Sequence, residues 1–192
     1  MPKLSTSDFR PGLTLDLDGE LYTISEFQHV KPGKGGAFVR TKLKGVVNEK
    51  NIEKTFRSGE SVDTVRIETH PYQFLYFDGD LYHFMHQETY EQVALEESRV
   101  QRSGFFSDGI TCSLVIDADH ETILYAEPPA HIVSVVTQTD PGLRGDTAQG
   151  GSKPATIASG AVVQVPLFIN EADEIKVDTR TGEYIERVNT NG

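Results

Sequence analysis

Lys34 is the residue of this 192-residue chain whose setting most directly suggests chemistry. Glycine tolerates the left-handed backbone of tight turns, and the flanking segments 27–30 and 38–43 have the alternation of strands. We therefore predict a long β-hairpin with Lys34 at its tip, where a flexible ammonium group could enter a narrow site on a larger partner. The alternative is an ordinary glycine-rich turn with a solvated lysine. The predicted tip has the sequence Lys31-Pro32-Gly33-Lys34-Gly35-Gly36-Ala37-Phe38.

A basic segment contains this lysine, although the whole chain is acidic, with a formal net charge of −11. Residues 31–57 contain eight Lys or Arg and two acidic residues. Residues 58–142 contain three Lys or Arg and 15 acidic residues. One interpretation is a basic end docked on phosphate and a middle that is kept off phosphate or faces a basic protein. The other is a chance cluster on a solvated strand face. Phosphate contacts would make the affinity strongly dependent on salt, and we expect them from Arg40, Lys42 and Lys44.

Tyr184 and Arg187 are of the types that stack on splayed RNA bases. Three residues apart on a strand, they would face opposite ways, so they can act together only if the strand ends or bends there. The alternative is a tyrosine at the edge of the core and a solvated arginine.

A catalytic constellation is not evident. His83 and His86 would lie on opposite faces of a strand, which disfavours joint metal ligation. The glycines around Lys34 lack the frame of a phosphate-binding loop and precede a strand, not a helix. Asp and Ser are plentiful, but no nucleophile elbow places them. We therefore predict a binding protein, not an enzyme, without metal and without cofactor.

Alternation with a period of two residues dominates the chain and predicts an all-β fold. Asp18-Gly19 and Asp78-Gly79 separate strand-like runs as hairpin turns do. Only the stretch 90–99 suggests a short helix. The first domain boundary is expected near residues 61–65, after the basic segment. The second is expected at Pro128-Pro129, because two prolines make the backbone rigid. We therefore predict three small β-barrel domains, over residues 1–63, 64–127 and 128–192. A long irregular loop over residues 140–153 is a candidate functional loop.

The single cysteine, Cys112, fits a reducing cytosol, and its apolar neighbours suggest a structural role in a strand. Apolar runs are too short to span a bilayer, and the first residues lack the apolar region of a signal peptide. We expect a cytoplasmic protein that does not enter membranes.

Two segments carry a resemblance to bacterial elongation factor P. The first consists of Asp8-Phe9-Arg10 together with residues 30–40, which read Val-Lys-Pro-Gly-Lys-Gly-Gly-Ala-Phe-Val-Arg. The other is 139–147, Thr-Asp-Pro-Gly-Leu-Arg-Gly-Asp-Thr, continued by Lys-Pro-Ala-Thr at 153–156, Val-Pro-Leu-Phe at 165–168 and Asp-Thr-Arg-Thr-Gly-Glu-Tyr at 178–184. Motifs at both ends, in order and at matching spacing, make the resemblance specific from about residue 7 to residue 188.

The resemblance implies an N-terminal SH3-like, KOW-type barrel and two OB-fold barrels in an L-shaped, tRNA-like arrangement. It implies a monomer that contacts both subunits of the ribosome between the P and E sites and relieves stalling at consecutive prolines. The residue matching Lys34 points to the peptidyl-transferase centre, and those matching Tyr184 and Arg187 contact P-site peptidyl-tRNA. The loop near the small subunit and the E-site codon matches Gly145, Asp146 and Thr147.

In many family members a modifying enzyme extends the tip lysine, commonly with a β-lysyl or an aminopentanol group, and the sequence leaves open which, if any, is added to Lys34. The chain departs from the family's pattern at Ala172, a turn position where the family often has glycine. We expect a small change of turn geometry without loss of function. The alternatives are the elongation factor P-like paralogue, which the intact tip disfavours, and a general OB-type RNA-binding protein, which the acidic middle disfavours.

Overall fold

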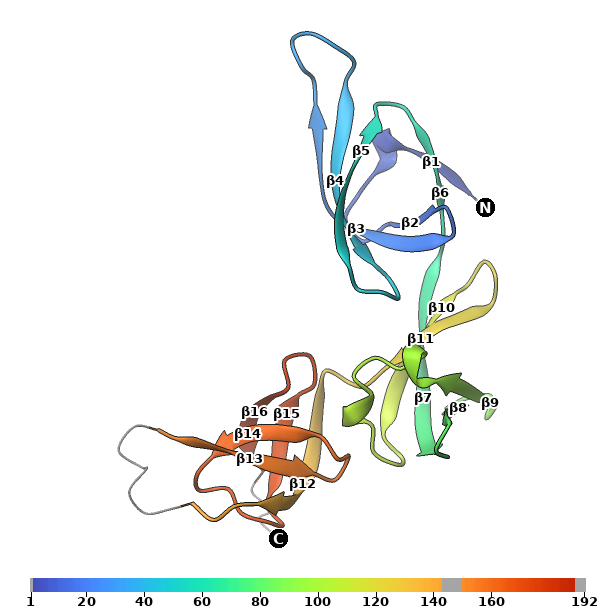
Figure 1. Cartoon of the computed structure of the whole chain (residues 1–192). Coiled ribbons are helices and arrows are strands. Elements are labelled where there is room, and N and C mark those ends of the chain that lie inside the picture. The colour runs from blue at the N-terminus through green and yellow to red at the C-terminus, as the bar shows by residue number, and fades with distance from the viewer. Residues whose placement is uncertain (1, 143–149, 189–192) are drawn as a thin grey trace. The chain divides into compact units, whose positions relative to one another are not determined.

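The computed structural model describes residues 2–142 and 150–188, and these residues form three β-sheets (Figure 1). Their regular structure consists of strands and three short 3₁₀ turns, without an α-helix in the described residues. The all-β prediction is confirmed. The chain divides into two compact units, one of residues up to Thr69 with Val115–Tyr125, the other of His70–Leu114 with residues from Ala126 onward. The predicted domain limits after residues 63 and 127 stay predictions.

The first sheet has the strand order β1-β6-β2-β3-β4-β5 and holds the basic segment. The turn between β2 and β3 has positive φ at both Asp18 (57°) and Gly19 (89°), as a two-residue hairpin turn requires. Leu15, Val39 and Leu43 are fully buried in the core of this sheet. Its strands are β1 (Lys3–Ser5), β2 (Thr14–Leu17), β3 (Glu20–Val30), β4 (Phe38–Gly45), β5 (Asn51–Arg57) and β6 (Ser61–Thr64).

The second sheet has the order β11-β10-β7-β8-β9. Its buried aromatic rings pack with Phe74 5.4 Å from Phe84 and 5.3 Å from Phe106, centroid to centroid. Cys112 is buried in β10, and burial raises the pKa of its thiol to about 12. The strands are β7 (Ile67–Phe77), β8 (Leu81–His86), β9 (Gln92–Glu96), β10 (Thr111–Asp117) and β11 (Thr122–Glu127).

The short helix predicted over residues 90–99 is wrong. Residues Gln92–Glu96 form β9, which pairs antiparallel with β8, and a 3₁₀ turn follows at Glu97–Arg99. Val93 and Leu95 are two residues apart, so both side chains lie on one face of a strand, with Leu95 buried. Pairing with β8 decides the conformation of this stretch.

The third sheet has the order β14-β13-β12-β15-β16 and surrounds a core that includes Val136, Val165 and Ile175. Phe105 and Ile110, from the segment before β10, pack against this core. None of the described segments forms a helix long and apolar enough to cross a membrane. The strands are β12 (His131–Thr139), β13 (Ser152–Ile157), β14 (Val162–Pro166), β15 (Glu174–Asp178) and β16 (Glu183–Arg187).

Candidate functional site

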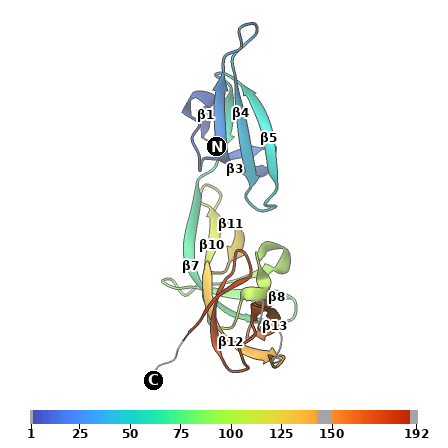
Figure 2. The same cartoon turned by 90° about the vertical axis from the view of Figure 1, so that its left-hand side faces the viewer.

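The predicted hairpin with Lys34 at its tip is confirmed. β3 and β4 pair from Tyr22 opposite Gly45 up to Val30 opposite Phe38, and the chain between these ends is the Lys34 tip, residues 31–37. Both views show this hairpin reaching beyond the other strands of its sheet (Figure 1 and Figure 2). Where the tip joins β4, the backbone N–H of Ser58 donates to the carbonyl of Ala37 at 3.0 Å. The strands therefore hold the hairpin, and the tip lies past the last ladder pair.

Residues 31–36 of the Lys34 tip are exposed. Lys34 is exposed, and its side chain makes no hydrogen bond or ion pair with residues 2–142 and 150–188. Gly35 has φ +112°, a backbone that disfavours other residues. A Cβ added at Gly33 or Gly36 would meet no described atom within 4 Å. The described chain therefore gives no packing reason for those two glycines.

The predicted basic face lies on β4. Arg40, Lys42 and Lys44 are exposed and alternate with the buried Val39, Thr41 and Leu43, so the three cations share the outer face. Lys42 Nζ lies 2.8 Å from Glu26 Oε2 on β3, and this contact raises the pKa of Lys42. Both partners are more than half exposed, so the ion pair stabilises the fold little. Part of the Lys42 charge is matched within the chain, which the sequence did not indicate.

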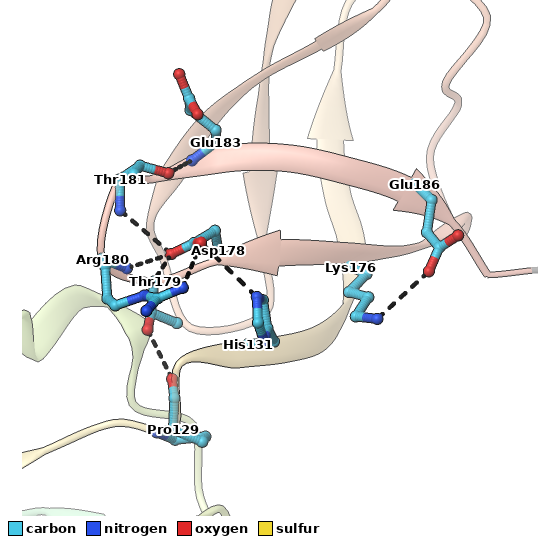
Figure 3. A network of polar contacts seen from close by, with 9 residues as sticks. All are labelled: Pro129, His131, Lys176, Asp178, Thr179, Arg180, Thr181, Glu183 and Glu186. Atoms are coloured by element: carbon cyan, nitrogen blue, oxygen red, sulfur yellow. Dashed lines mark hydrogen bonds and ion pairs between the residues drawn. The ribbon is translucent and has the colours of Figure 1, made fainter.

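A second candidate region is the turn between β15 and β16, residues 178–182, here called the Asp178 turn (Figure 3). Asp178 Oδ1 accepts the backbone N–H groups of Arg180 at 2.8 Å and Thr181 at 3.4 Å. Its Oδ2 lies 3.1 Å from Arg180 Nη2 and 3.7 Å from His131 Nε2. The Arg180 side chain and these backbone donors lower the pKa of Asp178 to about 2. The carboxylate thus fixes the turn that leads into β16.

The Asp178 turn is also tied to the start of β12. Thr179 is 1% exposed, and its hydroxyl donates to the carbonyl of Pro129 at 2.6 Å (Figure 3). The backbone N–H of Thr179 donates to the carbonyl of Ala130 at 2.9 Å. Two hydrogen bonds therefore hold the turn against the segment that enters β12.

Tyr184 and Arg187 lie on the same face of β16 because the strand contains a β-bulge. Tyr184 lies opposite Val177 and Arg187 opposite Ile175, while Ile185 is an extra residue in the register. Directly opposite residues point to the same side of a sheet, and Val177 and Ile175 are both buried. The bend that the sequence analysis required is present, and the two side chains can act together.

Phe168 is a residue of this region that sequence reasoning missed. Its side chain is 57% exposed, and the guanidinium carbon of Arg187 lies 5.5 Å from its ring centroid. Asp173 Oδ2 lies 3.8 Å from Arg187 Nη1 and holds the same guanidinium. The sequence offers only an aromatic residue at the end of a strand-like run, which is also the last residue of the motif at 165–168. It does not reveal the contact with Arg187.

The described residues at either end of the predicted loop 140–153 have defined contacts. Lys153, 6% exposed, donates from its ammonium to the carbonyl of Asp140. A Cβ at Gly142 would come within 2.5 Å of the carbonyl oxygen of Leu167, so this position needs glycine. The predicted small-subunit loop residues Gly145, Asp146 and Thr147 lie outside the described residues.

The histidines considered for metal binding have other contacts. His83 Nε2 lies 2.6 Å from Asp78 Oδ2, and His86 Nδ1 accepts the backbone N–H of Glu88 at 3.1 Å. Within residues 2–142 and 150–188, no group of three or more His, Cys, Asp or Glu is placed to hold a metal ion.

Comparison with known proteins decides the family. Family models of elongation factor P match the chain in order: the KOW-like domain over residues 5–62, the OB domain over 67–124 and the C-terminal domain over 132–187. The chain belongs to the elongation factor P family. It is therefore a translation elongation factor that works with the ribosome, and the predicted KOW-type and OB-type architecture is confirmed.

Relatives in this family match the chain over nearly its whole length. The elongation factor P of Azobacteroides pseudotrichonymphae is 54% identical over 184 residues, which cover 96% of this chain and 98% of that protein. The elongation factor P 1 of Porphyromonas gingivalis is 50% identical with the same coverage. A solved translation initiation factor eIF-5A family protein of Naegleria fowleri is 13% identical, with a TM-score of 0.52, over 65% of this chain and 96% of its own. At this identity the solved structure is similar in fold alone.

Proposed function

We propose that this elongation factor P family member binds the ribosome between the P and E sites and stimulates peptide-bond formation at consecutive prolines. In this proposal the Lys34 tip reaches toward the peptidyl-transferase centre. Tyr184 and Arg187 contact P-site peptidyl-tRNA, and the outer face of β4 contacts RNA phosphate.

The observation that carries the proposal is the composition of the Lys34 tip. Gly33 and Gly36 are not crowded by any described atom, and Lys34 makes no described polar contact. Since the fold does not require these residue types, a requirement of a binding partner explains them best. Glycines allow close approach of the backbone to a ligand, and a lysine is a compact cation on a long stem. These properties suit a narrow site on a larger RNA-containing partner.

The mechanism we propose is positioning. Proline is a rigid and poor nucleophile, so misalignment of the two tRNA ends raises the barrier to peptide-bond formation. Holding reactants in a near-attack geometry can lower a barrier by several kcal/mol, and a tenfold gain in rate needs only about 1.4 kcal/mol. Lys34 then acts by contact with the peptidyl-tRNA end and need not transfer a proton.

Lys34 is also placed for covalent extension. Its ammonium is exposed, and the neighbouring glycines leave space for a modifying enzyme to surround it. A longer side chain would increase the reach of the tip and add a polar group at its end. We propose that such an enzyme is a partner of this protein and that no separate cofactor takes part.

The test is the rate of synthesis through three consecutive proline codons in a purified translation system. Reactions contain the wild-type chain, Lys34→Ala, or neither, and intact mass reports whether Lys34 is modified. We expect acceleration by the wild-type chain and a loss of most of it in Lys34→Ala. Equal, slow synthesis in all three reactions, with a wild-type chain that carries its modification, would refute the proposed function.

A further inference from the structure

A groove of about 920 Å³ opens on the third sheet between β14 and β16. These strands stand at the two ends of the strand order and approach each other to close the sheet (Figure 1). The volume lies within the roughly 300–1,000 Å³ typical of small-molecule sites. This β14–β16 groove is lined in part by Ser152, Val162, Gln164, Phe168, Glu183 and Tyr184.

The walls of the groove combine flat apolar surfaces with polar groups. Phe168 and Val162 are 57% and 64% exposed, although both are large apolar side chains. Tyr184 is half-buried and packs with its ring against the core of the sheet. The amide of Gln164 and the hydroxyl of Ser152 lie 3.5 Å apart at the same groove. An occupant with apolar faces and a hydrogen-bonding edge would match this lining.

Charge is distributed unevenly around the groove. The Arg187 guanidinium lies over the Phe168 ring, and Glu183 is one of the residues that line the groove. A phosphate inside the groove would meet the Glu183 carboxylate, whereas one beside Phe168 would meet a guanidinium. The β-bulge at Ile185 produces this arrangement, since without it Arg187 would point to the opposite face from Tyr184.

We propose that the β14–β16 groove receives one unpaired nucleobase of the RNA that this factor binds. The faces of the base lie against Phe168 and Tyr184, and its edge faces Gln164 and Ser152. Unpaired bases are bound in this way, by stacking on aromatic rings and by hydrogen bonds to their edges. The Ser152 hydroxyl donates to the amide oxygen of Gln164, and an apolar peptide would make no use of the amide N–H groups of Gln164. The inference rests on the proposed tRNA contact and adds Phe168 and the groove to it.

The test is an NMR titration of the ¹⁵N-labelled full chain with adenosine 5′-monophosphate. Ribose 5-phosphate, which has the sugar and the phosphate but no base, is the matched ligand control. We expect the nucleotide to shift the amides of β14, β16 and residues 150–152, and ribose 5-phosphate to leave them in place. Phe168→Ala should weaken binding about 5- to 150-fold, the usual range for loss of one base–aromatic stack.

Two further variants separate the groove from general effects. Phe168→Tyr keeps a ring and should restore binding, and Phe77→Ala removes a similarly exposed ring outside the groove and should leave binding unchanged. Equal shifts with ribose 5-phosphate, no groove shifts at millimolar nucleotide, or undiminished binding by Phe168→Ala would overturn the proposal. Groove shifts that follow protein concentration would assign the surface to a second copy instead. The titration contains no ribosome, so its outcome is separate from that of the polyproline assay.

Discussion

The Lys34 tip and the Asp178 turn both join two neighbouring strands, and both carry or precede candidate functional residues. In the Asp178 turn, one carboxylate accepts two backbone N–H groups and pairs with Arg180, and Thr179 donates to Pro129. In the Lys34 tip, the lysine makes no polar contact with the described residues. The first region is fixed before any partner binds. The Lys34 side chain has no such contact among the described residues, so substitutions in the two regions should affect stability differently.

The largest effect on stability is expected from Thr179→Val. The buried hydroxyl is lost, and the carbonyl of Pro129 is left without its donor. Such a loss costs about 1–3 kcal/mol of unfolding free energy. Urea unfolding followed by circular dichroism measures it. Thr181→Val, at an exposed position of the same turn, is the matched control. If Thr179→Val lowers the unfolding free energy no more than this control does, Thr179 does not anchor the turn.

A gain of stability is expected from Ala172→Gly. Ala172 has φ +70°, in the left-handed region where a Cβ costs roughly 1–2 kcal/mol. Residue 172 therefore has the left-handed backbone that glycine readily adopts, and this conformation is strained for alanine. Some of the gain is offset because glycine is more flexible when unfolded, so we expect about 1 kcal/mol. Gly160→Ala, the reverse change at φ +88° with no described atom within 4 Å of the added Cβ, should lower stability. Equal stability of Ala172→Gly and wild type would show that the turn is unstrained.

A smaller effect is expected from pH. The pKa of Asp178 is lowered in the folded chain from its ordinary 3.8 to about 2, so its charged form stabilises the fold. This contribution is complete above the unfolded pKa and is lost as the pH falls from about 4 to about 2. Asp178→Asn should make stability less dependent on pH in this window, with Asp108→Asn, an exposed aspartate of the same unit, as the control. An unchanged slope in Asp178→Asn would contradict the role of this carboxylate.

The sequence predicted the hairpins well because their signals are local. Asp18-Gly19 supplies a two-residue turn, and alternation in β4 places Arg40, Lys42 and Lys44 on one face. The helix expected over residues 90–99 was wrong because pairing with β8, a contact between segments, decided that stretch.

Long-range register also explains what the sequence left out of the candidate sites. The extra residue in β16 at Ile185 is defined only by pairing with β15, and it brings Arg187 to Phe168. Similarly, the pairing of Lys42 with Glu26 follows from the β3–β4 register. Alternation alone gives the faces of a regular strand, but it cannot locate a bulge or a cross-strand partner.

The most direct measurement of the contrast between the two regions uses the double variant Gly33→Ala/Gly36→Ala. Its urea unfolding and its rate of synthesis through three proline codons are measured in parallel. An added Cβ at either glycine meets no described atom within 4 Å, and neither glycine has positive φ, so the unfolding free energy should not fall below that of wild type. The lower flexibility of the unfolded chain should raise it by up to about 1 kcal/mol per substitution. If these glycines serve a narrow site on the ribosome, acceleration should fall clearly. A variant that is as stable as wild type and accelerates synthesis equally well would contradict the account of the Lys34 tip.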